Sequence, residues 1–305
     1  MKLALPTSYI KLVNTLFPDE ASAWLNNTQN LLANCQTNFG LRDLQLIENL
    51  SYNLVLSAHC KQYGPVIVKI CLPGDAAMRE ILALEKYQGH YACRCYYCDT
   101  AARLMILERL IPGASLRQVK KRDERVAIFA DLASNLLITA SDCWLFPTYR
   151  EVIDQAFSKT RLSGKYSALM SEQITKADAY YQEIENRNLE KFLLHADLHH
   201  DNILTTPQGR KAIDPHGLIG ERVLETARFL ENELPLEEIT QESVFKLSEL
   251  LAQHFKEDRQ SIAQAWFIDY VLSLCWDLED NNMDWDFSQH LGILDLIDNA
   301  IKTNS

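Results

Sequence analysis

The sequence predicts an α+β fold in two lobes: a small N-terminal lobe built on an antiparallel sheet with one key helix, and a larger, mainly helical C-terminal lobe. Strand-like runs dominate the first 110 residues, whereas runs with helical periodicity follow from residue 114 onward. The turn-forming sequence Ile111-Pro112-Gly113 separates the two regions. We therefore expect an N-terminal lobe over residues 1–111 and a C-terminal lobe over residues 112–305, with ligands bound in a cleft where they meet.

The N-terminal lobe is expected to be rich in strands. The run Val66-Ile67-Val68-Lys69-Ile70 is typical of a buried strand. The turn Pro73-Gly74-Asp75 follows it, and Asp75 is a suitable N-cap for the next helix, which Gly89 ends. The expected elements are a helix over 21–34, strands over 44–50, 53–59 and 65–71, a helix over 76–88, and strands over 91–97 and 103–110.

The C-terminal lobe is expected to be helical, with one interruption. A β-hairpin is predicted from residues 191–194 through a loop to residues 202–206, the turn Pro207-Gln208-Gly209 and residues 211–213. The expected helices cover residues 124–140, 165–185, 242–255, 261–278 and 290–301.

The composition excludes several classes of partner. The 305-residue chain has a formal net charge of −11, and its last 85 residues hold 18 acidic but only six basic side chains. Binding to nucleic acid or to an anionic membrane needs surplus Lys and Arg, so we expect neither. No apolar run approaches the roughly 18 residues that a membrane span requires. The acidic segment suits a cationic small molecule, or it forms a solvated surface.

Eight cysteines without an export signal indicate reduced thiols and a cytoplasmic protein. Three of them form the cluster Cys93-x-Cys95-x-x-Cys98, which could belong to a zinc site. The surrounding residues alternate as in a strand with two faces, which places Cys95 and Cys98 on opposite faces. Ligands on opposite faces do not easily close a tetrahedral site, so small buried thiols are the favoured interpretation.

The predicted hairpin carries the residues that point to chemistry. Its loop contains Asp197 and Asn202, five positions apart, and Asp214 follows twelve residues after Asn202. If the two strands pair, the loop and the far strand end come together, so that two carboxylates and one amide oxygen converge. Hard oxygen ligands of this kind suit Mg²⁺, which favours carboxylates together with substrate phosphates.

Two sequence blocks, HADLHHDNIL and AIDPHGLIG, resemble the catalytic core of the aminoglycoside/hydroxyurea phosphotransferase family, a streptomycin 6-kinase-like branch of the protein-kinase-like superfamily. The resemblance implies an ATP- and Mg²⁺-dependent kinase that phosphorylates a hydroxyl of a small molecule. It implies that Asp197 is the catalytic base and that Asn202 and Asp214 hold the metal.

The same resemblance implies a strand lysine paired with a helix glutamate. Lys69 lies in a predicted strand, and Glu80 follows eleven residues later in the next helix. Glu85 is the alternative, but it lies on a different helical face, so Glu80 is preferred. The resemblance also implies an adenine-binding hinge at Glu108 and Leu110.

The sequence departs from kinase patterns in three ways. Some of these departures distinguish the chain from protein kinases, and one makes the assignment of the phosphate-covering turn less specific. No G-x-G-x-x-G occurs, so the phosphate-covering turn is assigned to the segment that contains Ser51. Ala196 stands where the family usually has glycine and protein kinases have arginine. Pro215-His216 replaces the usual Phe-Gly after Asp214, and no A-P-E follows.

The acceptor expected from the resemblance is an aminoglycoside such as streptomycin. Trp276, Asp277 and Asp280 form the nearest candidate for a cationic-acceptor site, although a solvated helix end explains them equally well. A kinase of a sugar or amino alcohol and an inactive nucleotide-binding relative stay open as alternatives.

A metal hydrolase is a further alternative, because four of the eight histidines lie near the two blocks. It is disfavoured, since no H-E-x-x-H occurs. The four are His195, His199, His200 and His216.

Overall fold

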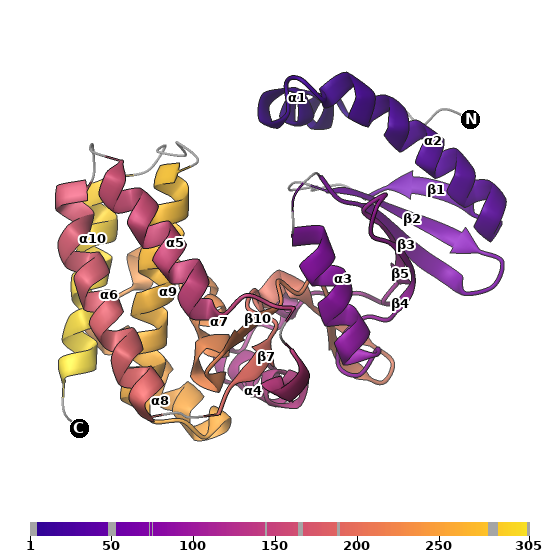
Figure 1. The fold of residues 1–305 in the computed structure, drawn as a ribbon. Coiled ribbons are helices and arrows are strands. Elements are labelled where there is room, and N and C mark those ends of the chain that lie inside the picture. The colour runs from indigo at the N-terminus through magenta and orange to yellow at the C-terminus, as the bar shows by residue number, and fades with distance from the viewer. Residues whose placement is uncertain are drawn as a thin grey trace. The chain divides into compact units, whose positions relative to one another are not determined.

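The computed structural model describes residues 5–47, 53–72, 74, 76–143, 145–163, 167–187, 190–279 and 286–303. Its chain forms two compact units, residues 1–113 and 114–305, with the division after Gly113 rather than at the expected residue 111 (Figure 1). The first unit contains the larger sheet and the second contains most of the helices, as the predicted α+β class requires.

The N-terminal unit is built on a five-stranded antiparallel sheet in the order β1-β2-β3-β5-β4. Alternation along the central strand β3 sends Val66, Val68 and Ile70 into an apolar core that also contains residues of the N-terminal helices. Lys69 therefore points to the opposite face. The strands are β1 (Arg42–Leu46), β2 (Leu54–Cys60), β3 (Gly64–Ile70), β4 (Cys95–Asp99) and β5 (Leu104–Glu108).

Three helices complete this unit. Helix α2 (Ala21–Phe39) extends beyond its predicted end and stops at Gly40, which has a left-handed backbone with φ 59°. Helix α3 (Ala76–Tyr87) follows β3 as predicted, although its expected N-cap Asp75 lies outside the described residues. Helix α1 (Thr7–Leu16) was not predicted; it contributes Tyr9 and Val13 to the core shared with α2.

The edge strand β4 differs from the sequence prediction. It begins at Cys95 rather than Tyr91, and its register slips between Cys95 and Tyr97, as in a β-bulge. The expected placement of Cys95 and Cys98 on opposite faces is wrong, because the two thiols are hydrogen-bonded to each other. Both also line a cavity of about 350 Å³ beside α3. Burial raises the pKa of both thiols. Within the described ranges, His, Cys, Asp and Glu form no cluster of three that could hold a metal.

The C-terminal unit is organised around helix α9 (Arg259–Glu279), which is buried along most of its length. Five helices contact it, and Figure 1 shows several of them running alongside. Helices α5 and α7 were not predicted; the other boundaries lie within a few residues of the predicted ones except for the end of α4. The helices are α4 (Arg122–Leu136), α5 (Tyr149–Leu162), α6 (Ser167–Arg187), α7 (Ala227–Glu233), α8 (Gln241–Phe255) and α10 (Phe287–Lys302).

Two small sheets replace the single predicted hairpin. Strands β8 (Ile203–Thr206) and β9 (Gly209–Ala212) form the predicted antiparallel pair. Strand β7 (Phe192–Leu194) instead pairs with β6 (Ile138–Thr139) and β10 (Leu218–Gly220). Helix α4 ends at Leu136 instead of Ala140 because β6 follows it. The loop of residues 195–202 therefore connects β7, in the three-stranded sheet, to β8, in the two-stranded sheet.

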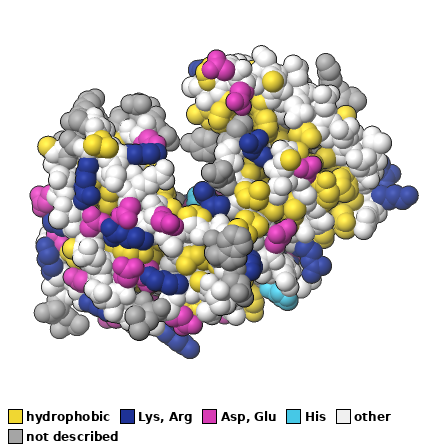
Figure 2. Space-filling view, in the orientation of Figure 1, with side chains coloured by type: hydrophobic (Ala, Val, Ile, Leu, Met, Phe, Trp, Pro, Cys, Tyr) yellow, Lys and Arg dark blue, Asp and Glu magenta, His cyan; other side chains and the backbone are white. Residues whose placement is uncertain are grey.

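The surface charges of the helical unit are mixed rather than segregated. Figure 2 shows basic and acidic side chains interspersed on its visible face. Ion pairs such as Lys159–Glu279 and Arg161–Asp178 join them. Among the residues that the structure describes, none belongs to a helix long and apolar enough to cross a membrane.

Candidate active site

His195 anchors the loop between β7 and β8. Its Nε2 donates to the carbonyl of Ile213 at 2.8 Å, and its Nδ1 accepts from the Asp197 amide at 3.3 Å. Burial lowers the pKa of His195 to about 3, so the imidazole is neutral near pH 7. The side chain thus joins the start of the loop to the residue before Asp214.

Glu225 fixes the backbone of the same loop from a distant part of the chain. Its carboxylate accepts from the amides of His195, at 2.6 Å, and Ala196, at 3.2 Å. Burial raises the pKa of Glu225 to about 8. Ala196 has a left-handed backbone with φ 61°, a conformation that favours glycine. Sequence patterns did not single out Glu225, since it lies thirty residues from the loop in an acidic segment.

Asp197 and Asn202 are joined directly. The Asn202 side-chain Nδ2 donates to the Asp197 carbonyl at 2.9 Å and to Asp197 Oδ2 at 3.0 Å. Both hydrogen bonds use the amide nitrogen, which leaves Asn202 Oδ1 as the atom that could bind a cation. Burial raises the pKa of Asp197, against the opposing charge of Arg228.

Asp214 lies close to this pair. The Ile213 amide donates to the Asn202 carbonyl at 3.0 Å, where β9 returns beside β8. The negative charge of Asp214 contributes, after burial, to the raised pKa of Asp197, so the two carboxylates lie within electrostatic range of each other. Two carboxylates and one amide oxygen fit Mg²⁺ when phosphates complete its coordination.

Arg228, in the first turn of α7, is a site residue that the sequence did not reveal. Its Nε lies 3.6 Å from Asp197 Oδ1 and 3.3 Å from Asp269 Oδ2, and its Nη1 donates to Glu231 Oε2 at 3.2 Å. The guanidinium carbon also stands 5.7 Å from the ring centre of Trp276. One arginine therefore connects the loop with α9, whose sequence carries no kinase motif.

Three other histidines lie in or near the loop and have different partners. His199 Nε2 and His216 Nε2 lie 3.7 and 3.6 Å from Asp197 Oδ2. His200 turns away and forms a 2.6 Å contact with the carboxylate of Glu233, stacked on Phe229. None of the described histidines joins a three-ligand metal cluster.

In the N-terminal unit, Lys69 and Glu80 form the predicted pair. Lys69 Nζ donates to both carboxylate oxygens at 2.8 Å, and the two residues are only 3% and 7% exposed. The strand alternation that turns Lys69 away from the apolar core directs it to α3. Glu85 accepts instead from the Cys98 thiol at 3.7 Å, so the structure selects Glu80.

The remaining predicted nucleotide contacts stay predictions. The Glu108 amide donates to the Arg94 carbonyl at 2.8 Å, and its carboxylate accepts from the Arg94 amide at 3.0 Å. Leu110 is buried, and a Cβ on Gly113 would lie 2.7 Å from its carbonyl oxygen, so only glycine fits that turn. Ser51 lies outside the described residues.

The predicted acceptor residues fall partly within the described chain. Arg228 stands over the ring of Trp276, and this places Trp276 in the neighbourhood of Asp197. Asp277 follows on α9, and its charge adds to the burial that raises the pKa of Tyr270. Asp280 lies outside the described residues.

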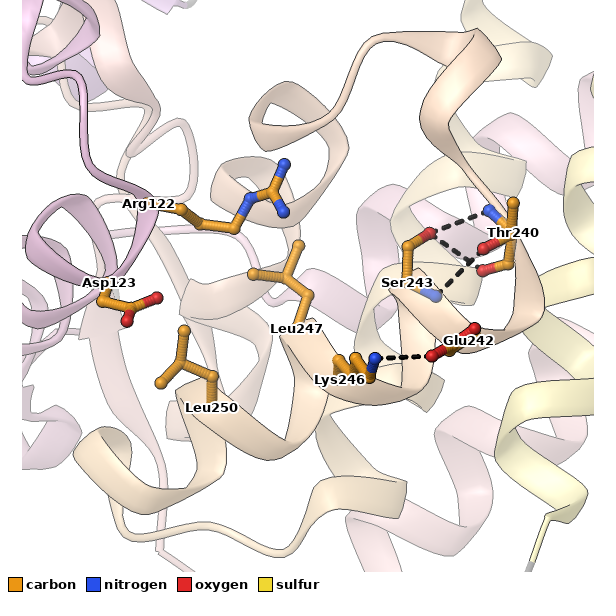
Figure 3. Close-up of a pocket in the computed structure, with 8 residues that line it drawn as sticks. All are labelled: Arg122, Asp123, Thr240, Glu242, Ser243, Lys246, Leu247 and Leu250. Carbon is orange, nitrogen blue, oxygen red and sulfur yellow. Dashed lines mark hydrogen bonds and ion pairs between the residues drawn. The ribbon is translucent and has the colours of Figure 1, made fainter.

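A separate cavity of about 440 Å³ opens between the first turns of α4 and α8 (Figure 3). Thr240 and Ser243 form a capping box there, and Glu242 pairs with Lys246. None of the predicted site residues lines it. The lining residues are Arg122, Asp123, Thr240, Glu242, Ser243, Lys246, Leu247 and Leu250.

Comparison with known proteins gives a consistent result. A family model described as aminoglycoside/hydroxyurea antibiotic resistance kinase matches residues 43–281. Streptomycin 3''-kinase from Klebsiella pneumoniae is 29% identical over 174 residues, which are 55% of this chain and 61% of that protein. This chain therefore matches only about three-fifths of the length of that relative.

Solved structures show the fold. A choline/ethanolamine kinase family protein from Mesorhizobium loti aligns with a TM-score of 0.63 at 16% identity, covering 86% of this chain and 89% of that one. Aminoglycoside phosphotransferase APH(4)-Ia in complex with AMP-PNP and hygromycin B aligns with a TM-score of 0.58 at 15% identity, covering 88% and 97%. The predicted protein-kinase-like α+β fold is confirmed.

Proposed function

Because the chain belongs to the aminoglycoside/hydroxyurea antibiotic resistance kinase family, we propose that it transfers the γ-phosphoryl group of ATP to a hydroxyl of a small molecule. The observation that carries this proposal is the loop in which Asn202 holds Asp197 by two hydrogen bonds, with Asp214 beside them. A carboxylate held next to cation-binding oxygens is what hydroxyl phosphorylation needs.

Asp197 would accept the proton of the acceptor hydroxyl as that oxygen attacks the γ-phosphorus. Its Oδ2 is occupied by the Asn202 amide at 3.0 Å, which leaves Oδ1 to receive the hydroxyl. Asn202 Oδ1 and Asp214 would hold Mg²⁺, which neutralises phosphate charge when bound. Since the transition state of phosphoryl transfer is loose, positioning and charge supply most of the rate.

Lys69 would bind the α- and β-phosphates of ATP. A lysine with both carboxylate oxygens of Glu80 at 2.8 Å is held in one direction. Glu108 and Leu110 are proposed to bind the adenine through their backbone, and the segment with Ser51 to cover the phosphates.

The proposed acceptor is an aminoglycoside such as streptomycin. The similarity to a streptomycin kinase and to a hygromycin B complex supports this class. Asp277 supplies negative charge for a polycation. Asp280 is proposed for the same role from the sequence alone. The eight cysteines, which all lie among the described residues, are thiols rather than disulfides, and this supports a reducing, cytoplasmic location.

Incubation of the purified chain with Mg-ATP and single acceptors tests the proposal. The panel is streptomycin, hygromycin B, hydroxyurea, choline, ethanolamine and a simple sugar, with phosphorylated product detected by mass spectrometry. We expect an aminoglycoside to gain one phosphate, and the Asp197→Asn variant to give none.

Phosphorylation of choline, ethanolamine or the sugar alone would replace the aminoglycoside assignment but keep the kinase. Nucleotide binding without any transfer would favour an acceptor outside the panel. Absence of both binding and transfer would support the inactive alternative and refute the proposal.

A further inference from the structure

We propose that Arg228 is a positioning residue that holds Asp197 in its reactive orientation; this inference rests on the proposed phosphotransfer. Two side chains fix the orientation of the Asp197 carboxylate, one at each of its oxygens. Asn202 Nδ2 binds Oδ2 at 3.0 Å, whereas Arg228 Nε faces Oδ1 at 3.6 Å. The second distance is longer than a hydrogen bond, so the arginine supplies charge without occupying the oxygen that would receive the acceptor hydroxyl.

Arg228 itself is held on its other sides by the core of the helical unit. Its Nη1 donates to Ser273 Oγ at 2.9 Å and to Glu231 Oε2 at 3.2 Å. Asp269 receives Nη2 at 3.5 Å and, on the same oxygen, the Tyr149 hydroxyl at 2.6 Å. These partners lie on α5, α7 and α9, so the position of the guanidinium is set by packed helices. Asp197 is the one partner of this set that lies in the loop.

The charges around Asp197 show why a fixed cation matters. Asp214, Asp269 and the loop-binding Glu225 are acidic neighbours. The histidines His199 and His216 face Oδ2 rather than Oδ1. Arg228 therefore provides the permanent positive charge opposite Oδ1. Without it, repulsion from the acids would turn the carboxylate away from its position.

A purely structural role would have a different signature. Arg228 could serve only to neutralise the buried acids Asp269 and Glu231, in which case its loss would lower stability but leave the folded enzyme active. The Arg228→Gln variant alone does not separate these roles, because it leaves Glu231 without its cation. The double variant Arg228→Gln/Glu231→Gln removes the acid at position 231 together with the arginine, while Asp269 keeps its hydrogen bond from the Tyr149 hydroxyl.

The test is steady-state kinetics on the full chain with Mg-ATP and streptomycin, or the panel acceptor that gives product. For Arg228→Gln/Glu231→Gln we expect a kcat lower by on the order of 10- to 100-fold, with the KM for ATP within about twofold of wild type. Glu231→Gln alone should keep most of the activity. Arg228→Lys, which keeps the charge but not the planar fork, should restore part of the lost kcat.

Arg222→Gln is the matched control. Arg222 is a part-buried arginine of the same unit that stacks on Phe255 and pairs with Glu257, and it should keep a wild-type kcat. A folded double variant with wild-type kcat would overturn the inference alone. A wild-type chain inactive on the whole panel would overturn the proposed function and this inference together. An equal loss of kcat in the Arg222 control would also count against a specific role of Arg228.

Discussion

The two ionic centres of this protein are built differently. In the N-terminal unit, Lys69 and Glu80 form a balanced pair, one cation with one acid, from a strand and the helix that follows it. In the C-terminal unit, one arginine is shared among several acids, since Arg228 faces Asp197, Asp269 and Glu231. The first centre has one acid for one cation, whereas the second carries more acidic than basic groups.

The difference in charge balance indicates a different role for each centre. In the balanced pair, the carboxylate of Glu80 is engaged by the Lys69 ammonium and is not available as a proton acceptor. The pair therefore serves to hold the ammonium in a fixed place. A centre with excess acid keeps one carboxylate oxygen available, and it can attract a cation or a positively charged acceptor. The following predictions test this contrast in order of expected effect.

The largest effect is expected for Asp197→Asn. Loss of the proton acceptor should lower kcat by on the order of 10³-fold, with nucleotide binding largely kept. Initial rates of ADP formation and nucleotide-dependent thermal stabilisation measure the two quantities. Asp201→Asn, in an exposed pair with Arg117, is the control and should lose little activity. Robust turnover by Asp197→Asn would remove the proposed base.

A second prediction concerns the balanced pair. Glu80→Gln leaves the Lys69 ammonium buried without its counter-charge and should lower the free energy of unfolding by about 3 kcal/mol. Urea denaturation measures this change. Lys69→Met/Glu80→Leu should recover most of the stability, though not activity. Glu85→Gln, on the same helix, should change stability by less than about 0.5 kcal/mol; a comparable loss there would show that the pair is not special.

The excess acid of the second centre predicts a pH effect on stability. Burial raises the pKa of Glu231 to about 8, above its value in the unfolded chain. The folded state therefore binds more protons between about pH 5 and 8, so the free energy of unfolding should fall as the pH rises through that window. Denaturation at pH 5.5 and 8 measures the slope, which Glu231→Gln should flatten. An unchanged slope in the variant would contradict the assignment.

The smallest effect is expected in the loop itself. Ala196→Gly relieves a left-handed backbone but makes the unfolded chain more flexible, so we expect a net stabilisation of about 0.5 kcal/mol. Thermal unfolding measures the change. Ala227→Gly has an ordinary helical φ of −64° and should instead destabilise the protein. Destabilisation by both substitutions would indicate that the Ala196 methyl group packs favourably.

The contrast also explains what the sequence could predict. Lys69 and Glu80 were predicted to pair because the family resemblance implies a strand lysine paired with a glutamate on the next helix, and the structure contains that pair. Asp197, Asn202 and Asp214 were predicted because they lie in two short sequence blocks that resemble the family motif. Arg228 and Asp269 were missed because tertiary packing of α7 on α9 joins them, and their spacing has no local signature.

The prediction for strand β4 was wrong for a related reason. Its alternation predicted opposite faces for Cys95 and Cys98, but a slip in register against β5 moves one residue out of the pattern. A prediction from side-chain alternation assumes that every residue of a strand pairs in register with the neighbouring strand. A β-bulge breaks that register, and its position depends on the neighbouring strand as well as on the residues of the bulged strand.

The central position of α9 has a consequence for biosynthesis. This helix contacts α5, α6, α7 and α8, all of which the ribosome makes before it. Asp269 and Ser273, which hold Arg228, therefore emerge later than Asp197 and later than Arg228 itself. Until α9 has been synthesised, the helical unit lacks its central helix. Arg228 then lacks its contacts with Asp269 and Ser273. We expect a nascent chain to acquire its phosphotransfer geometry in one late step, when α9 leaves the exit tunnel.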